Sequence, residues 1–298
     1  MTKSPPELFY KYMTGGTARI VLERHTLRWS TPALFNDPYD TQFDLHVEGD
    51  RDEVRQRSLE KLWNAWYGDG PYKPHPNNLQ GQLIKKYRAV FPKMSREEFE
   101  AEMGQSIDEG FENAMRALPA LQAEFRSEMS NSKILCQSIV PDSLLMWSYY
   151  ADHHRGAVLC FKADPGLNSP WLVAQAVTYS RSMPRIGDVE FFSDLSAGLV
   201  ALDAKTLVDQ VIFTKAAEWA HEGEWRLQAG SGRHKEAAFE DVPFHRSELD
   251  AVIFGCVMSP GDRAALKEIV RNQYPHARIL AARKHDREFR LVIETVES

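Results

Sequence analysis

The sequence predicts an α+β protein in which strands and helices occupy separate parts of the chain. Strand-like segments gather before residue 31 and after residue 132, whereas residues 51–131 are rich in Glu, Arg, Gln, Ala and Met. This separation favours α+β over a doubly wound sheet. We therefore expect one domain over residues 1–298, with the helical segment 51–131 inserted in it.

The N-terminal forty residues predict strand, helix, strand and turn. Residues 8–12 form a short aromatic strand, Thr17 caps a helix that runs to residue 24, and residues 26–30 alternate like a second strand. Asn36-Asp37-Pro38 favours a turn, because an Asp side chain binds nearby backbone and the residue before Pro avoids the helical region. We expect this turn to fix a loop that forms one wall of a cleft.

The inserted segment carries a clear helix start. Ser95 and Glu98 have the spacing of a capping box. Pro119 should kink or end this helix. The apolar stripe that follows the cap recurs every four residues, as in a helix face packed on a core: Phe99, Met103, Ile107, Phe111 and Met115.

Strand signals return from residue 133. A helix should begin at Ser259, with Pro260 in the first position and Leu266, Ile269 and Val270 facing inward. The expected strands are 133–140, 156–162, 173–180, 210–213, 224–228, 251–255, 278–281 and 287–295.

Composition narrows the class of protein. The chain is 43% hydrophobic and 26% charged, which excludes collagen-like and disordered classes. A net charge of −6 argues against a diffuse surface for nucleic-acid phosphates. Three widely spaced cysteines and the lack of a long apolar run predict a reduced, cytoplasmic protein with no membrane span.

Few residues suggest chemistry on their own. His153-His154 and His285-Asp286 do not make ready metal sites, because adjacent side chains on a strand point to opposite faces. We expect no metal. Glu222 and Glu224 are two residues apart, so on a strand they share one face. Such a pair either divides catalytic roles or pairs with Arg or Lys, and spacing alone leaves both interpretations open.

Four segments together resemble the signature segments of the bacterial domain-of-unknown-function 2971 family. They occur in the family's order and span most of the chain between residues 8 and 255. The segments are FYKYM, LRWSTPALFNDPYD, MWSYYADHHRGAVLCF and EWAHEGEWRL.

The beginning of this family also resembles ADP-ribosyltransferases, including toxins and phage-defence proteins. The resemblance implies their mixed or antiparallel sheet core and a site for NAD. Lys11 stands where those proteins have His or Arg, Ser30 falls near their second motif, and Glu222-Gly223-Glu224 matches their Glu-x-Glu. We expect the strands over 10–12 and 224–228 to be neighbours beside a cleft.

The resemblance also implies roles. Glu224 would stabilise the oxocarbenium-like ribose formed when the nicotinamide bond breaks, and Glu222 would position or deprotonate an acceptor. Lys11, with Tyr12 beside it, would hold the adenosine side or the phosphates. The aromatic residues expected at the nucleotide are Tyr39, Trp147, Tyr150 and Trp219.

The expected function is therefore an NAD-dependent ADP-ribosyltransferase-like protein, either a transferase or an NAD glycohydrolase, in a toxin or phage-defence role. NAD would be a substrate, and the acceptor could be protein or nucleic acid. One alternative is a non-catalytic nucleotide- or protein-binding partner, such as an antitoxin. A second is a metal-dependent nucleic-acid-processing enzyme with ligands among Asn36, Asp37, Asp40, Glu222 and Glu224.

Overall fold

The computed structural model describes residues 4–296, and the chain divides into two compact units. The first unit contains the residues up to Gln42, Glu128–Ser182, and the residues from Phe213 onward. The second contains Phe43–Ser127 and Met183–Ile212. No helix within residues 4–296 is both long and apolar enough to cross a membrane.

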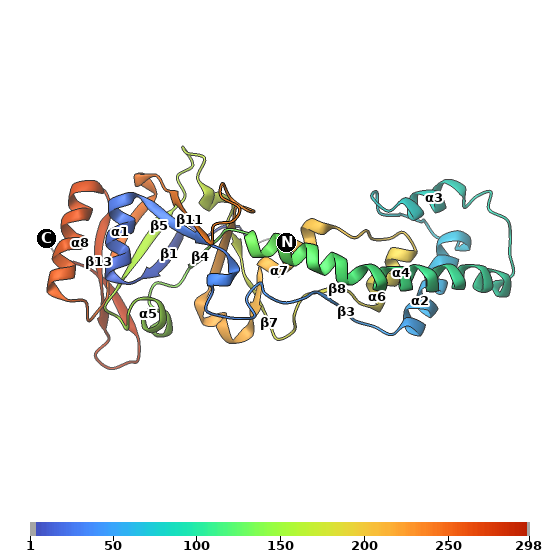
Figure 1. Ribbon diagram of the computed structural model, residues 1–298, viewed down its shortest axis with the longest axis horizontal. Helices are drawn as coiled ribbons and strands as arrows, with labels where there is room; N and C mark the ends of the chain where they lie inside the picture. Colours follow the sequence, from blue (N-terminus) through green and yellow to red (C-terminus); the bar gives the residue numbers. More distant parts are fainter. Residues whose placement is uncertain (1–3, 297–298) are drawn as a thin grey trace. The chain divides into compact units, whose positions relative to one another are not determined.

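The first unit is built on a large, mostly antiparallel sheet (Figure 1). Its strands follow the order β11-β2-β4-β1-β5-β12-β13-β14, with β10 paired to β4 and β6 paired to β10 beside this path. This arrangement confirms the α+β class. The strands are β1 (Leu8–Met13), β2 (Thr26–Ser30), β4 (Ile134–Ser138), β5 (Ala157–Lys162), β6 (Gln175–Ala176), β10 (Glu224–Gln228), β11 (Phe239–Pro243), β12 (Leu249–Phe254), β13 (Arg278–Lys284) and β14 (Leu291–Thr295).

The sheet opens along one edge of β4. β10 pairs with β4 along its whole length, but β1 meets β4 only at Tyr10–Ser138 and β2 meets it only at Ser30–Ile134. Residues 135–137 therefore have no partner from β1 or β2. The expected neighbours β1 and β10 lie in one sheet, but β4 separates them. This corrects the expected adjacency, and the opening beside β4 positions the site described below.

Helices α1 (Gly15–Arg24) and α8 (Pro260–Gln273) lie side by side against the sheet (Figure 1). Their buried residues, Leu22 and Leu266 among them, join a core that includes Phe9, Trp171 and Trp225. Helix α5 (Leu144–Tyr150) packs against β1 in a smaller apolar cluster, in which Trp147 of α5 contacts Tyr12 of β1. A separate two-stranded sheet in this unit pairs β7 (Thr178–Ser180) with β9 (Thr214–Ala216) in parallel.

The second unit is mainly helical. Helix α2 (Arg51–Tyr67) packs against α6 (Val189–Ser196), and Lys61 of α2 forms ion pairs with Glu190 and Asp194 of α6. Met183–Ile212 also belongs to this unit, although the predicted helical segment was confined to residues 51–131. The other elements are α3 (Leu79–Tyr87), most of α4 (Arg96–Asn131), α7 (Ala204–Ile212) and the short parallel pair β3 (His46–Val47) and β8 (Arg185–Gly187).

Several local expectations need correction. Of the two effects expected of Pro119, a kink or an end, the end does not occur, because α4 runs through Pro119 for 36 residues. Residues 210–213 are not a strand, since α7 runs to Ile212 and buries Leu207 and Val211 at helical spacing. The first helix begins at Gly15, because Thr14 and not Thr17 caps it.

Candidate functional site

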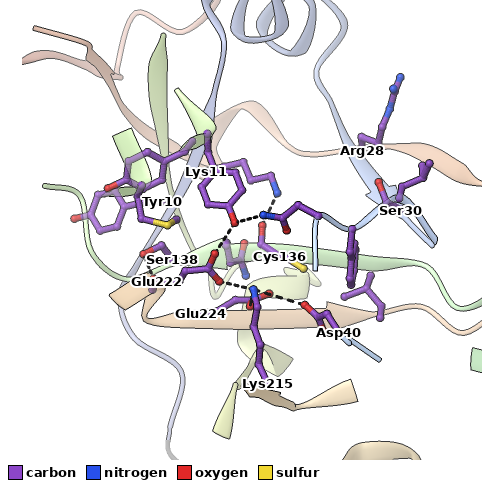
Figure 2. A pocket seen from close by; sticks show the side chains of 18 residues that line it. Tyr10, Lys11, Arg28, Ser30, Asp40, Cys136, Ser138, Lys215, Glu222 and Glu224 are labelled. Carbon is purple, nitrogen blue, oxygen red and sulfur yellow. Dashed lines mark hydrogen bonds and ion pairs between the residues drawn. The ribbon is translucent and has the colours of Figure 1, made fainter. Parts of the chain in front are cut away.

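A cavity of about 270 Å³ lies where β1 and β2 part from β4 (Figure 2). Seven parts of the first unit line it: strands β1, β2, β4 and β9, the loop after β2, helix α5, and the segment around Gly223. These segments are far apart in the sequence, so the opening in the sheet is what brings their side chains together.

Lys11 enters the cavity from the strand that borders the opening. Its Nζ donates a hydrogen bond of 2.5 Å to the backbone carbonyl of Cys136 on β4 (Figure 2). Lys11 follows Tyr10, the last residue of β1 with a partner on β4. The ammonium thus bridges the two strands at the point where their backbone pairing stops.

Tyr150 connects the loop wall to a carboxylate. Its hydroxyl donates to Glu222 Oε1 at 2.6 Å and accepts from the Asn36 amide at 2.9 Å. Asp37 accepts a hydrogen bond from the Tyr39 amide, which is the turn expected there. Asn36 therefore belongs to the cavity wall, and its side chain reaches a group that contacts Glu222.

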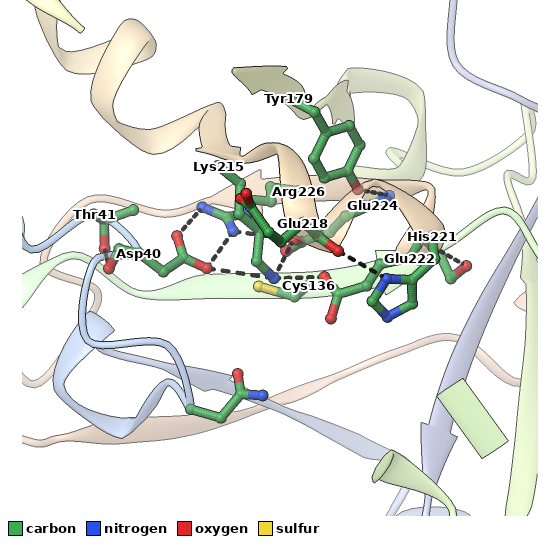
Figure 3. A network of polar contacts seen from close by, with 12 residues as sticks. Asp40, Thr41, Cys136, Tyr179, Lys215, Glu218, His221, Glu222, Glu224 and Arg226 are labelled. Carbon is green, nitrogen blue, oxygen red and sulfur yellow. Dashed lines mark hydrogen bonds and ion pairs between the residues drawn. The ribbon is translucent and has the colours of Figure 1, made fainter. Parts of the chain in front are cut away.

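A buried cluster of charges adjoins the cavity, and four of its five members line it (Figure 3). Lys215 contacts Glu222 at 2.5 Å, Glu224 at 3.0 Å and Asp40 at 3.6 Å. The Arg226 guanidinium binds Glu224 through Nε at 2.7 Å and Nη2 at 3.0 Å, and binds both oxygens of Asp40. Three carboxylates thus share two cations, and all five side chains are buried.

The two glutamates of this cluster are held in different electrostatic states. Burial alone would raise the pKa of Glu224, but the charges of Arg226 and Lys215 outweigh it and hold the pKa below its usual range. Burial raises the pKa of Glu222, against the opposing charge of Lys215. Burial raises the pKa of Asp40 as well. Glu224 is therefore the most firmly ionised of the three.

The backbone around Gly223 sets the direction of both glutamates. Glu222 ends a 3-10 segment (Ala217–Glu222), and Gly223 has a positive φ of 53° before β10 begins at Glu224. Only Glu224 belongs to the strand, so the expectation that both glutamates share one strand face is wrong. The Glu222 carbonyl accepts from Ser138 at 2.5 Å, and the Glu224 amide donates to Tyr179 at 2.7 Å.

The cavity brings together most of the residues that the sequence singled out, and leaves three outside. Tyr39 is 61% exposed and does not line the cavity. Trp147 is fully buried with its Nε1 bonded to the Pro141 carbonyl, so it presents no face to a ligand. Trp219 also lies outside the lining and packs against Lys215. The singled-out residues that line the cavity are Lys11, Tyr12, Ser30, Tyr150, Glu222 and Glu224.

The two cations of the cluster, Lys215 and Arg226, were not among the residues predicted for the site. Arg226 had a usable signal, because it is two residues after Glu224 and so shares its face of β10. Lys215 had no such signal in the sequence. It is a single lysine in the short strand β9, which pairs with β7, and only the folded structure brings it to the glutamates. Asp40 was named only as an alternative metal ligand.

The carboxylates do not form a metal site within residues 4–296, where no group of three or more His, Cys, Asp or Glu is arranged to hold an ion. The oxygens that would bind a metal instead bind Lys215 and Arg226. Comparison with protein-family models, curated proteins and solved structures gives no match to this chain.

Proposed function

We propose that the cavity binds NAD or a related nucleotide and cleaves its bond to nicotinamide, as an ADP-ribosyltransferase-like enzyme or an NAD glycohydrolase. The observation that carries this proposal is that Lys11, Ser30, Tyr150 and the two glutamates line one cavity. They come from segments chosen for a resemblance to such enzymes. A toxin or phage-defence role would follow from consumption of NAD.

The geometry favours Glu222 over Glu224 as the carboxylate that acts on the ligand. Both oxygens of Glu224 are bound by Arg226, and one is also bound by Lys215. Glu222 has one oxygen on Lys215 and the other on the Tyr150 hydroxyl. A nucleotide can therefore reach Glu222 by displacing or sharing one neutral hydroxyl, whereas reaching Glu224 requires breaking a buried ion pair.

In this proposal the charge of Glu222 stabilises the cation that develops on the ribose as nicotinamide leaves. Its raised pKa suits the same group to accept a proton from an attacking water or acceptor hydroxyl. Tyr150 fixes the position of the carboxylate, and Asn36 fixes Tyr150. Glu224 holds Lys215 and Arg226 in place behind it.

The test measures nicotinamide released from NAD by the purified full chain, using chromatography. We expect Glu222→Gln to slow release by about 10²–10³-fold, the effect of losing one preorganised electrostatic group. The matched control is Glu218→Gln, because Glu218 is exposed and does not line the cavity. A wild-type chain that binds NAD but releases no nicotinamide would contradict the catalytic proposal.

One observation favours a second candidate, a nucleotide-binding module without catalysis. Every carboxylate of the cluster already has a buried cation as partner. Such neutralised carboxylates can be purely structural. The same experiment separates the two candidates, since the binding module would bind NAD or ADP-ribose with measurable affinity and leave the nicotinamide bond intact.

A further inference from the structure

The buried side chain of Gln137 has an amide nitrogen without a hydrogen-bond acceptor among the described residues. It lies on β4 in the stretch that neither β1 nor β2 pairs, it is 4% exposed, and it lines the cavity. Its Nε2 is inaccessible and has no hydrogen-bond acceptor in the structure. Buried amide donors are nearly always paired, because an unmade hydrogen bond costs the full desolvation of the group. A ligand oxygen would satisfy this one.

Lys11 is the residue opposite Gln137. Antiparallel pairing of Tyr10 with Ser138 places Lys11 and Gln137 at the next position, on the same face, where the strands have begun to part. Within the described chain, Lys11 Nζ has one hydrogen-bond acceptor, the Cys136 carbonyl. An ammonium carries three donors, so two remain for a ligand. A cation and an unpaired amide therefore border the same opening.

We propose that Gln137 and Lys11 together bind the phosphate oxygens of the nucleotide, which assigns a phosphate subsite to the opening between β1 and β4. The inference rests on the proposed function and defines its substrate class as phosphate-bearing nucleotides, not nucleosides. A phosphate offers several acceptor oxygens and a negative charge, which suit an amide donor beside an ammonium.

Arg28 adds a second positive charge to the same cavity. Its guanidinium lies 3.7 Å from the centre of the Phe239 ring and pairs with Asp241, which holds it at the β2 side of the opening. The carboxylate Glu222 lies with Tyr150 at the α5 side. The donors for a phosphate and the carboxylate for a ribose thus lie at different sides of one cavity. A nucleotide, which carries both groups, would need such a separation.

The test uses calorimetric titration of the full chain with ADP-ribose, which carries phosphates, and with nicotinamide riboside, which does not. We expect Gln137→Leu and Lys11→Met each to weaken ADP-ribose binding by about 10- to 100-fold, the usual effect of a hydrogen bond to a charged group. Binding of nicotinamide riboside should change by less than about twofold. Without ligand, Gln137→Leu should melt at the same or a higher temperature, because it removes an unpaired buried amide.

Matched controls remove the same chemical groups elsewhere on the sheet. Gln228→Leu removes an amide that already has a partner, Ser132, and Lys162→Met removes a lysine of β5 outside the cavity. Both should keep the affinity for ADP-ribose. Equal affinity in Gln137→Leu, equal losses for both ligands, a lowered melting temperature in that variant, or a wild-type chain that does not bind ADP-ribose would each overturn the phosphate subsite.

The two proposals fail in different ways. If Gln137→Leu and Lys11→Met weaken ADP-ribose binding but the wild-type chain releases no nicotinamide, the phosphate subsite stands and the catalytic proposal fails. If the wild-type chain cleaves NAD and both variants bind ADP-ribose as it does, the catalytic proposal stands and the phosphate subsite fails.

Discussion

At the scale of single residues, the site is governed by how five buried charges are shared. Lys215 is the central group, since it is the cation that contacts all three carboxylates. Arg226 binds Glu224 and Asp40 with two or more hydrogen bonds each. Removing one member of such a buried set leaves the others without compensation, which costs more than the pair contributes when intact.

We therefore expect Glu224→Gln to destabilise the protein by about 3–5 kcal/mol, because Arg226 and Lys215 would stay buried with one carboxylate fewer. Urea-induced unfolding measures this change. The exposed Glu218→Gln should stay within about 0.5 kcal/mol of the wild type. If Glu224→Gln kept its unfolding free energy and lost only nicotinamide release, Glu224 would be the catalytic carboxylate that the resemblance implied.

The same cluster shows why the site could be predicted only in part. Lys11, Ser30 and the glutamates stood out because they lie in segments with unusual local composition. Lys215 did not, because its importance arises from tertiary contacts. From the sequence, Trp147 was expected to stack on a ligand, yet it lies on the buried face of α5 and its side chain packs in the core. Local sequence reveals which groups are chemically capable, but burial decides which of them a ligand can reach.

At the scale of elements, the turn at Gly223 links the 3-10 segment to β10. Its φ of 53° is a conformation that costs a non-glycine residue roughly 1–2 kcal/mol. An added Cβ would also lie 3.0 Å from Val140 Cγ2 and 3.2 Å from Ile139 Cγ1. The turn therefore has both a conformational and a packing reason to contain glycine.

We expect Gly223→Ala to lower the unfolding free energy by about 2 kcal/mol, from the positive φ together with the close side-chain contacts. Gly230→Ala is the matched control, because Gly230 has a φ of 54° and nothing within 4 Å of an added Cβ. It should lose only the conformational part, about 1 kcal/mol. Equal losses in the two variants would show that Val140 and Ile139 move aside freely.

Elements with strong local signals were predicted well, and those decided by packing were not. The capping box at Ser95 is present, with Glu98 bonded to the Ser95 amide at 2.9 Å and the Glu98 amide bonded to the Ser95 hydroxyl at 3.2 Å. The apolar run over 210–213 resembled a strand because short apolar runs fit either structure. Pro119 lies inside α4, which continues on both sides of it.

At the scale of the whole molecule, the second unit is discontinuous in sequence. Its two segments, Phe43–Ser127 and Met183–Ile212, are joined by the packing of α2 on α6. The sequence indicated only the first as a distinct part, because its helical composition contrasts with the strands around it. The second segment is short and lies between strands, so no compositional change marks it.

The stability of the whole molecule should fall in alkaline solution. The carboxylates around Lys215 outweigh its burial and raise its pKa above the usual 10.5. Burial raises the pKa of Tyr12 above the usual 10.0, and burial with the Glu222 hydrogen bond does so for Tyr150. All three groups therefore keep their protons in the folded state at a pH where the unfolded chain loses them. Their stabilisation is complete below about pH 10 and decreases as the pH rises through the folded-state pKa values.

Within the buried cluster the effects of acid partly cancel, because its carboxylates oppose one another. The lowered pKa of Glu224 stabilises the folded state at pH values above the usual pKa of a glutamate, and this stabilisation is lost as the pH falls. The raised pKa values of Glu222 and Asp40 have the opposite effect on stability.

The measurement is the free energy of unfolding by urea between pH 7 and 11.5. Burial also raises the pKa of the Cys136 and Cys160 thiols, so we expect the free energy of unfolding to be nearly level only to about pH 8.5, where unfolded thiols begin to ionise. Above that pH it should fall by about 1.4 kcal/mol per pH unit for each group that only the unfolded chain has deprotonated. Tyr12→Phe should remove one such group and make the alkaline slope shallower by that amount, besides a constant loss from its 2.6 Å hydrogen bond to the Val140 carbonyl. A slope that Tyr12→Phe leaves unchanged would mean that Tyr12 ionises in the folded protein as readily as in the unfolded chain, and that its buried position does not hold the proton.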